Sequence, residues 1–386
     1  MFYNAAFKRT ALQPYDMPLF WAVVGLLAMG LIMVYSSSIA VAELRTTSHS
    51  AQHYLFRHAV SLVIAIMASV ALFRLPSATW QKAAPILFLV AVVLLLVVLV
   101  PGIGQKVNGS WRWIRLGPLG NFQPSELMKL ATVIYAADYT VRKAGHMGSL
   151  QKGFLPMFLV MLGIAGLLQM EPDLGSTVVI VAIAMGILFL GGLNLRLFLL
   201  LLVLVGTGVA LLIIYEPYRV LRFLNMDPWV DPLRTGYQVT HALMAVGRGG
   251  WFGVGLGESV EKLSYLPEAH TDFLAAIIGE ELGAFGILIV LGLFSWVIWR
   301  AFSIGWQASL MGRNFQALVA QGVAVWLGAQ CFINIGVNLG ALPAKGLTLP
   351  LMSYGGSSLL VNCMAIALLL RVDYENRLLM RGGRLA

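Results

Sequence analysis

Long apolar runs separated by short polar segments follow one another along the whole chain. A run of about 20 apolar residues is long enough to cross a bilayer as a helix. Reading the runs between charges, prolines and glycines predicts ten membrane helices, at 18–40, 57–75, 83–101, 122–140, 154–171, 174–192, 196–215, 272–298, 315–339 and 356–371. The predicted fold class is an all-α polytopic membrane protein.

Composition supports this interpretation and leaves no stretch for a separate soluble domain. The 386 residues are 59% hydrophobic and 11% charged, and the mean hydropathy is +0.83. These values exclude an ordinary soluble protein. The first apolar run is too long for the core of a signal peptide, so we expect a retained helix. The predicted organisation is a cytoplasmic N-terminal tail at 1–17, a membrane domain at 18–371 with a large outer loop at 216–271, and a cytoplasmic C-terminal tail at 372–386.

The distribution of lysine and arginine sets the orientation. If both termini are cytoplasmic, the short inner segments carry many basic residues, which is the positive-inside pattern. The loop between the seventh and eighth helices is then outside, and long loops cross the membrane largely regardless of charge. The outer face also carries basic residues in short loops, where the positive-inside rule does not predict them. These residues are Lys106, Arg112, Arg115 and Lys345. They indicate either pairing with acidic neighbours and lipid phosphates or an anionic substrate held at the outer surface.

The outer loop ends in P-E-A-H-T-D-F, residues 267–273, directly before an apolar run. A Thr-Asp pair at this place is typical of a helix N-cap, so Asp272 is expected to cap the eighth helix. A carboxylate beside apolar surface also has its pKa raised by desolvation, which suits a general base. The two roles are compatible. Glu268 and His270 would either orient a substrate or stay solvated.

Charged residues inside the predicted spans are expected to have partners or functions, because burying a charge in a membrane is unfavourable. We predict that Lys129 in the fourth helix pairs with Asp173 or Glu171, as a structural clamp. Glu280 and Glu281 lie roughly 12–14 Å further along the eighth helix than Asp272. Carboxylates at that depth would also suit a proton-coupled transporter.

Three further patterns give weaker signals. His49, His53 and His58 have roughly helical spacing, but no carboxylate or thiol clearly joins them, so a metal site is not favoured. The glycine-rich stretch 247–257 lacks the preceding strand of a dinucleotide fingerprint and fits a loop packed close to the membrane surface. An interfacial aromatic belt is expected from Trp111, Trp113, Trp229 and Trp251.

Several segments together resemble one family. They are K-V-N-G-S-W-R-W-I-R-L-G-P (106–118), Q-P-S-E-L-M-K (123–129), E-P-D-L-G-S (171–176), Y-L-P-E-A-H-T-D-F (265–273), G-E-E-L-G (279–283) and L-P-A-K-G-L-T-L-P-L-M-S-Y-G-G-S-S (342–358). The chain is similar to the SEDS family of bacterial shape, elongation, division and sporulation proteins over nearly its whole length. The Ala-His before Thr-Asp and the K-G-L-T-L-P run favour a division-type member over an elongation-type one. Relatives often carry threonine where this chain has Ala344.

The resemblance implies ten helices with both ends cytoplasmic and a peptidoglycan glycosyltransferase that polymerises lipid II on the periplasmic face of the bacterial inner membrane during septal synthesis. The essential aspartate of the family's H-T-D motif corresponds to Asp272. The implied partners are lipid II, the nascent glycan strand, a class b penicillin-binding protein transpeptidase and other division proteins. Undecaprenyl diphosphate would be the leaving group.

A negatively charged leaving group requires cations near Asp272. The candidates are Lys345 first, then Arg248, Lys262 and Arg222, with a divalent cation, Mg²⁺ or Mn²⁺, as another source of positive charge. Ser357, in the S-Y-G-G-S-S run, offers a hydroxyl close by. Two alternatives remain open: a lipid II flippase, and a non-catalytic scaffold of the division machinery that docks the transpeptidase.

Overall fold

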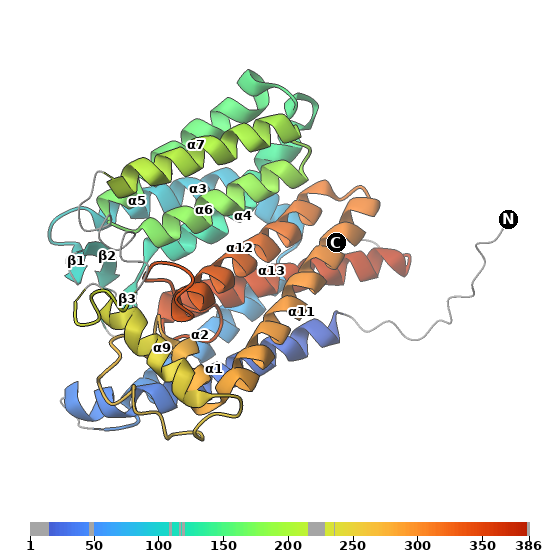
Figure 1. Cartoon of the computed structure of the whole chain (residues 1–386). Helices are drawn as coiled ribbons and strands as arrows, with labels where there is room; N and C mark the ends of the chain where they lie inside the picture. Colours follow the sequence, from blue (N-terminus) through green and yellow to red (C-terminus); the bar gives the residue numbers. More distant parts are fainter. Residues whose placement is uncertain are drawn as a thin grey trace.

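The computed structural model describes residues 15–45, 50–107, 110–115, 117, 120–214, 228–234 and 236–383. Within these residues the chain folds as a helical bundle with a small sheet at one end (Figure 1). The long helices are α1 (Met17–Arg45), α2 (His53–Arg74), α3 (Ser77–Val98), α4 (Pro124–Arg142), α5 (Leu155–Met170), α6 (Leu174–Leu190), α7 (Leu195–Ile214), α11 (Gly283–Leu310), α12 (Asn314–Asn338) and α13 (Gly356–Met380). The shorter elements are two helical turns, η2 (Ala144–His146) and η3 (Leu150–Phe154), and two helices, α9 (Tyr237–Gly249) and α10 (Leu274–Glu281).

Each predicted range overlaps a helix of the structure, and the chain is a polytopic membrane protein. In the described part of the chain, seven helices are long and apolar enough to span a membrane. The largest differences from the prediction concern the eighth and tenth helices. The eighth predicted helix is divided into α10 and α11 and continues past 298 to Leu310. The last helix continues past 371 to Met380, so the expected C-terminal tail begins as helix.

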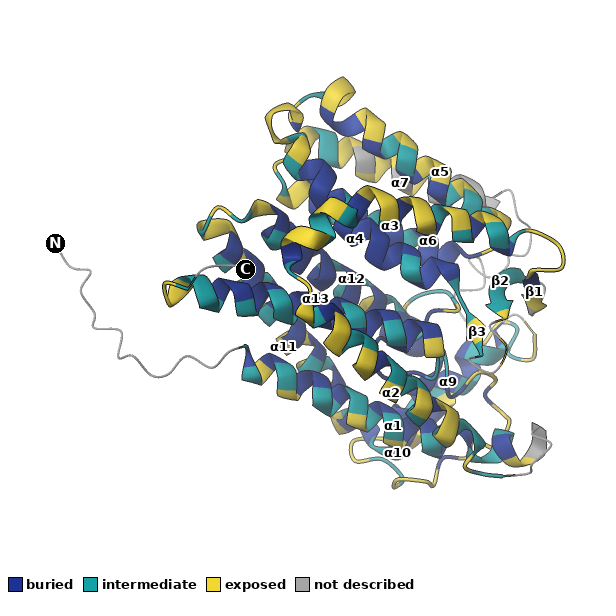
Figure 2. Cartoon of the chain, turned by 180° about the vertical axis from the view of Figure 1, so that it is seen from behind, coloured by how far each residue is buried: buried dark blue, intermediate teal, exposed yellow. Residues whose placement is uncertain are grey.

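The least apolar helices lie at the centre of the bundle. Helix α4 packs against α3, α6, α12 and α13, and it buries both Glu126 and Lys129. Figure 2 shows exposed residues gathered on α2, α3 and α5, whereas α12 is mostly buried. This arrangement is expected in a membrane, because polar side chains are tolerated there when they face other helices.

The described chain ends meet at one end of the bundle. Asp16, just before α1, forms an ion pair with Arg300 of α11 and lies 3.6 Å from Arg377 of α13. Close by in sequence, Glu375 of α13 pairs with Arg313 and Arg371. Arginines of the predicted cytoplasmic segments are therefore held by buried carboxylates. The opposite end of the bundle carries the sheet and α9 (Figure 1).

The sheet is an element that hydrophobic patterning did not predict. Strands β1 (Gly104–Val107), β2 (Ser110–Arg115) and β3 (Asn121–Phe122) form an antiparallel sheet in that order. Ile114 pairs with Gly104 on one side and with Phe122 on the other. The register of β1 and β2 is irregular at Arg112, because Gln105 pairs with Trp113 and Lys106 with Trp111, as in a β-bulge.

The break between α10 and α11 is closed by the glycine-rich stretch 247–257. The carbonyl oxygens of Glu280 and Glu281 accept from the N–H groups of Val254 and Gly255, at 2.9 and 3.1 Å. In the other direction, the first N–H groups of α11 donate to carbonyls of the stretch, Ala284 to Gly250 at 2.8 Å and Phe285 to Trp251 at 3.1 Å. Side chains would not fit this contact, because a Cβ at Gly249 would lie 1.9 Å from the Gly279 oxygen and one at Gly253 2.1 Å from the Glu281 oxygen. The glycines thus allow close packing in place of the missing helical hydrogen bonds.

Candidate functional site

The loop between α12 and α13 folds back into the bundle. Leu347, Leu349 and Met352 are buried, and a Cβ at Gly30, in the middle of α1, would lie 2.6 Å from the Cα of Met352. Non-helical backbone at such a depth needs protein partners for its polar groups. The K-G-L-T-L-P run of the sequence is therefore a re-entrant segment, with Lys345 at its outer end.

Three amide side chains on one face of α12 supply those partners. Gln330 donates to the carbonyl oxygen of Thr348 at 2.9 Å, and Asn334 to that of Leu347 at 2.6 Å. Asn334 and Asn338 also donate to the carbonyl oxygen of Asp272, at 2.9 and 3.0 Å. The three amides are spaced four residues apart and lie on one face of the helix. They join the re-entrant segment to the segment that carries Asp272.

This amide row is a functional feature that the sequence analysis missed. Its signal was present in the sequence, because Gln330, Asn334 and Asn338 recur every four residues in the otherwise apolar stretch 322–338. Polar side chains at one helical face in a membrane span indicate contacts across helices.

Asp272 does not cap the helix that follows it, so that prediction is wrong. The N-cap of α10 is Phe273, without a side-chain cap bond. Instead, Asn338 accepts from the N–H of Ala276 in the first turn, at 3.0 Å. The carboxylate of Asp272 is partly buried and faces the re-entrant segment, because a Cβ at Gly346 would lie 3.3 Å from its Oδ2. Since an adjacent helix stabilises the start of α10, the carboxylate is not needed for capping.

The surroundings raise the pKa of Asp272 from 3.8 to about 7. Burial is the main cause, and the negative charges of Glu268 and Asp173 act in the same direction. The positive charge of Arg112 acts against them. A carboxyl group with a pKa near neutrality is suited to accept a proton from a hydroxyl group at physiological pH.

Arg112 is a second feature of this site, and it was not among the predicted site residues. Its Nε donates to the carbonyl oxygen of Glu171 at 2.9 Å, and its Nη2 donates to that of Pro172. These two bonds fix the guanidinium group. A Cβ at Gly346 would lie 3.9 Å from Nη1 of Arg112, as well as beside the Asp272 carboxylate. The sequence had marked Arg112 only as one of several outer basic residues.

The other residues of the 267–273 segment lie close to Asp272. Glu268 is exposed, and its carbonyl oxygen accepts from the N–H of Asp272 at 3.1 Å. Glu268 has a φ of +57°, an uncommon value for a residue with a side chain. His270 is buried rather than solvated, and its ring lies 4.7 Å from that of Tyr54 and 5.5 Å from that of Tyr354.

The other predicted cations differ in how far their side chains are exposed to solvent. Lys345 is partly buried beside Gly346. Lys262 is buried and donates to Glu281 at 2.8 Å and to Ser36 at 3.1 Å. Arg248 pairs with Glu280 at 2.9 Å but keeps 46% of its side chain exposed. Arg222 lies outside the described residues.

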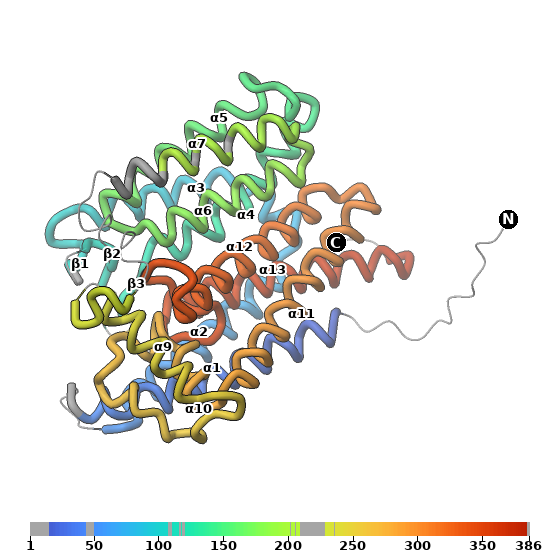
Figure 3. Tube along the Cα trace, viewed as in Figure 1, coloured from blue at the N-terminus to red at the C-terminus, as the bar shows by residue number. Residues whose placement is uncertain are grey.

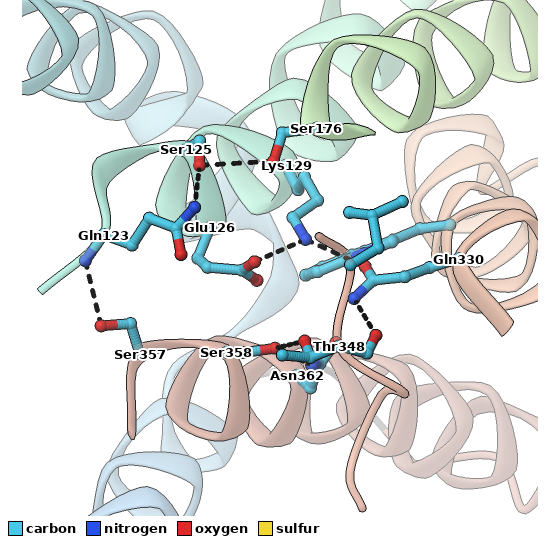
Figure 4. Close-up of polar contacts among 12 residues, drawn as sticks. Gln123, Ser125, Glu126, Lys129, Ser176, Gln330, Thr348, Ser357, Ser358 and Asn362 are labelled. Atoms are coloured by element: carbon cyan, nitrogen blue, oxygen red, sulfur yellow. Dashed lines mark hydrogen bonds and ion pairs between the residues drawn. The ribbon is translucent and has the colours of Figure 1, made fainter. Parts of the chain in front are cut away.

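Ser357 has a structural place. Its hydroxyl donates to the carbonyl oxygen of Asn121 at 3.1 Å and accepts from the N–H of Gln123 at 3.0 Å. It thereby joins the start of α13 to the connection between β3 and α4 (Figure 4). Because both bonds are to backbone groups and the side chain is buried, Ser357 is committed to this junction.

The predicted clamp between Lys129 and Asp173 or Glu171 is replaced by another pair. Lys129 lies 2.8 Å from Glu126, one turn earlier on α4, and donates to Gln330 at 2.9 Å (Figure 4). Asp173 caps α6 by accepting from the N–H of Ser176 at 3.1 Å. The reason is proximity within one helix, since residues three apart lie on the same face.

The histidines considered as metal ligands do not form a cluster in the described residues. His53 and His58 belong to α2, and His49 lies outside the described part of the chain. Among the side chains that the structure describes, no three His, Cys, Asp or Glu residues are placed to hold a metal ion.

Comparison with known proteins gives a consistent result. A family model described as "Cell cycle protein", which groups FtsW, RodA and SpoVE, matches residues 17–378. A protein of Aromatoleum aromaticum named "Probable peptidoglycan glycosyltransferase FtsW" is 57% identical over 374 residues, 96% of this chain and 91% of that protein. A protein of the same name from Burkholderia thailandensis is 55% identical over 380 residues, 97% of this chain and 82% of that one.

Solved structures agree. A chain from "Structural coordination of polymerization and crosslinking by a peptidoglycan synthase complex" aligns with a TM-score of 0.75 and 29% identity, covering 94% of this chain and 98% of that chain. The rod shape determining protein RodA of Thermus thermophilus aligns with a TM-score of 0.68 and 28% identity, covering 94% and 97%. The chain therefore belongs to the FtsW, RodA and SpoVE family of cell cycle proteins, the SEDS family that its motifs resemble.

Proposed function

We propose that this chain is a peptidoglycan glycosyltransferase that polymerises lipid II at the outer face of the bacterial inner membrane, with Asp272 as general base. The observation that carries the proposal is the Asp272 carboxylate. It has a pKa of about 7, and its backbone is held by Asn334 and Asn338. It lies beside Gly346, which is also close to Arg112 and directly follows Lys345 in the sequence.

In the proposed reaction, Asp272 acts as the base. Asp272 takes the proton from the 4-hydroxyl group of the acceptor sugar, and that oxygen attacks the anomeric carbon of the donor strand. The new C–O bond forms as the bond to the diphosphate breaks, with inversion, and the electron pair leaves on undecaprenyl diphosphate. General base catalysis of this kind contributes about 10²–10⁴-fold to a rate.

The leaving diphosphate needs positive charge close to the reacting carbon. Arg112 and Lys345 are our first choices, because one is fixed beside the carboxylate by two backbone carbonyls and the other precedes Gly346 in the same segment. Arg248 is partly exposed and would contact the substrate further out. Lys262 serves as a partner of Glu281 instead.

The finer parts of the proposal concern topology, place and partner. We propose ten spans, the eighth formed by α11 with α10 at its outer end, and both termini in the cytoplasm. The ion pair of Asp16 with Arg300 supports this, because it places an arginine of a predicted inner segment next to the start of α1. The partner is a class b penicillin-binding protein that cross-links the new strand, at the division septum, with other division proteins.

Transport of lipid II is the rival function, and one observation weighs against it. A proton-coupled transporter needs intramembrane carboxylates that change charge during the cycle. Glu280 instead accepts from Arg248, Ser259 and Val260, and Glu281 accepts from Lys262 and Ser36. Both carboxylates are thus committed to ion pairs and hydrogen bonds.

One preparation separates polymerisation from transport. Purified protein with its transpeptidase partner is reconstituted in liposomes with labelled lipid II, and polymerisation and translocation are measured in parallel for wild type and Asp272→Ala. Loss of glycan chains with intact complex formation supports a glycosyltransferase. Equal polymerisation by the two proteins would refute the general-base assignment, and wild-type translocation without polymerisation would support a flippase.

A further inference from the structure

The turn Gly250–Gly257 of the outer loop presents exposed large apolar side chains, of which two are the most exposed in the turn. Trp251 is 73% exposed and Phe252 is 86% exposed. No charged residue occurs between Gly249 and Gly257. We propose that this turn is inserted into the outer leaflet of the membrane, where Trp251 and Phe252 contact lipid at the depth of the headgroup–acyl boundary.

Backbone hydrogen bonds hold the turn against a membrane helix. Its carbonyls at Gly250 and Trp251 accept from Ala284 and Phe285, the second and third residues of α11. Figure 3 shows the traces of α9 and α10 side by side, and the two helices pack together. The turn therefore lies at the same depth along the bundle as the break between α10 and α11.

The level of the break follows from α1. Glu281, at the end of α10, accepts from Ser36 of α1 at 2.7 Å. Ser36 lies 19 residues after Met17, and a rise of 1.5 Å per residue places it about 28 Å along the helix. The start of α1 is marked by the ion pair of Asp16 with Arg300. Because the hydrocarbon core is about 30 Å thick, the break lies near its opposite boundary.

The neighbouring surface of α11 indicates that lipid is what contacts the turn. Helix α11 is one of the helices apolar enough to span a membrane, and its first turns expose Phe285, Leu288 and Ile289. The carbonyl oxygen of Trp251 accepts a hydrogen bond from the backbone N–H of Phe285. The apolar surface of the turn thus continues the lipid-facing surface of α11. Tryptophan and phenylalanine at this depth are typical of interfacial anchors, which bury their apolar groups roughly 5–10 Å into the boundary region.

Site-directed spin labelling in liposomes tests this placement. A single cysteine is introduced as Phe252→Cys, in a background where the buried Cys331 and Cys363 are replaced by alanine, and is labelled with a nitroxide. Collision with oxygen, which concentrates in lipid, is compared with collision with a water-soluble nickel chelate. Leu288→Cys is the lipid-facing reference, and Glu258→Cys is the matched control at the polar edge of the same turn.

We expect the label at 252 to collide several-fold more with oxygen than with the nickel chelate, as at 288, and the label at 258 to show the reverse. A label at 252 that collides more with the nickel chelate than with oxygen, as at 258, would overturn the proposal. Shielding of 252 from both reagents would also overturn it, because it would indicate a protein partner. Quenching by brominated acyl chains gives a second readout. Wild type should lose more fluorescence than Trp251→Phe, and equal losses would count against insertion.

Discussion

Asn338 fixes the backbone of Asp272 from a neighbouring helix. Its Nδ2 donates to the carbonyl oxygen of Asp272 at 3.0 Å, while its Oδ1 accepts from the N–H of Ala276 at 3.0 Å. One amide on α12 therefore replaces the N-cap of α10 and sets the position of the carboxylate. An eight-residue helix is too short to be stable alone, so the accuracy of the site depends on such contacts.

Asn338→Ala is expected to lower the polymerisation rate with a moderate loss of stability. Removing the amide leaves two buried backbone groups with fewer partners, and an unsatisfied group costs about 1–3 kcal/mol. A misplacement of about 1 Å reduces a rate by up to ~100-fold. Thermal unfolding and lipid II polymerisation measure the two effects. Asn314→Ala, at the exposed far end of α12, is the control, and an unaffected rate in Asn338→Ala would contradict this positioning role.

Lys345 and Lys262 should respond differently to removal of their charge. Lys345→Met is expected to reduce the polymerisation rate by about 100-fold, the effect of losing one group that stabilises developing charge. Lys262→Met leaves the buried Glu281 without its cation, and breaking a buried pair costs about 3–5 kcal/mol. It should lower the melting temperature. The opposite pattern would exchange the roles of the two lysines.

Lys129 and Glu126 should be energetically coupled, whereas Lys129 and Asp173 should not. The first pair is in contact at 2.8 Å, and residues in contact usually show interaction energies of about 0.5–3 kcal/mol in double-mutant cycles. Lys129→Met combined with Glu126→Gln is compared with Lys129→Met combined with Asp173→Asn by thermal unfolding. Coupling only in the second pair would restore the clamp expected from the sequence.

Arg112 and Glu268 should shift the pH dependence of the reaction in opposite directions. The charge of Arg112 lowers the pKa of Asp272, and that of Glu268 raises it. Arg112→Gln should therefore move the midpoint of the pH–rate profile to higher pH, and Glu268→Gln should move it to lower pH. Arg112→Lys serves as the control that keeps the charge. Shifts in the same direction would show that these charges do not act on the reacting carboxyl group.

The helical pattern could be predicted because apolar runs of bilayer length carry a strong signal. The positions of α2, α6 and α12 follow from it within a few residues. The break at Leu282 was not predicted, although G-E-E-L-G at 279–283 interrupts the apolar run there. It depends on backbone hydrogen bonds from a glycine-rich stretch about 30 residues earlier in the sequence, and no local propensity records such a contact.

The site was predicted only in part. The family's H-T-D motif singled out Asp272, but its capping role was inferred from spacing alone, and Asn338 supplies that role from another helix. Lys262 looked available because its partner Glu281 is distant in sequence. Arg112 was indistinguishable from other outer cations until β2 placed it beside Glu171. The sequence indicated which residues could carry the chemistry, but it did not predict which side chains of different segments are in contact.

The pH–rate profile of lipid II polymerisation tests the central claim most directly, with the transpeptidase partner present and saturating substrate. A general base acts in its ionised form, and the pKa of Asp272 is raised to about 7. We predict that the rate is constant above this value and falls about tenfold for each pH unit below it, while Asp272→Asn retains only a low rate that does not follow this profile. A wild-type rate that stays constant from pH 5.5 to pH 8.5, or an Asp272→Asn rate equal to wild type, would contradict the assignment of Asp272 as the base.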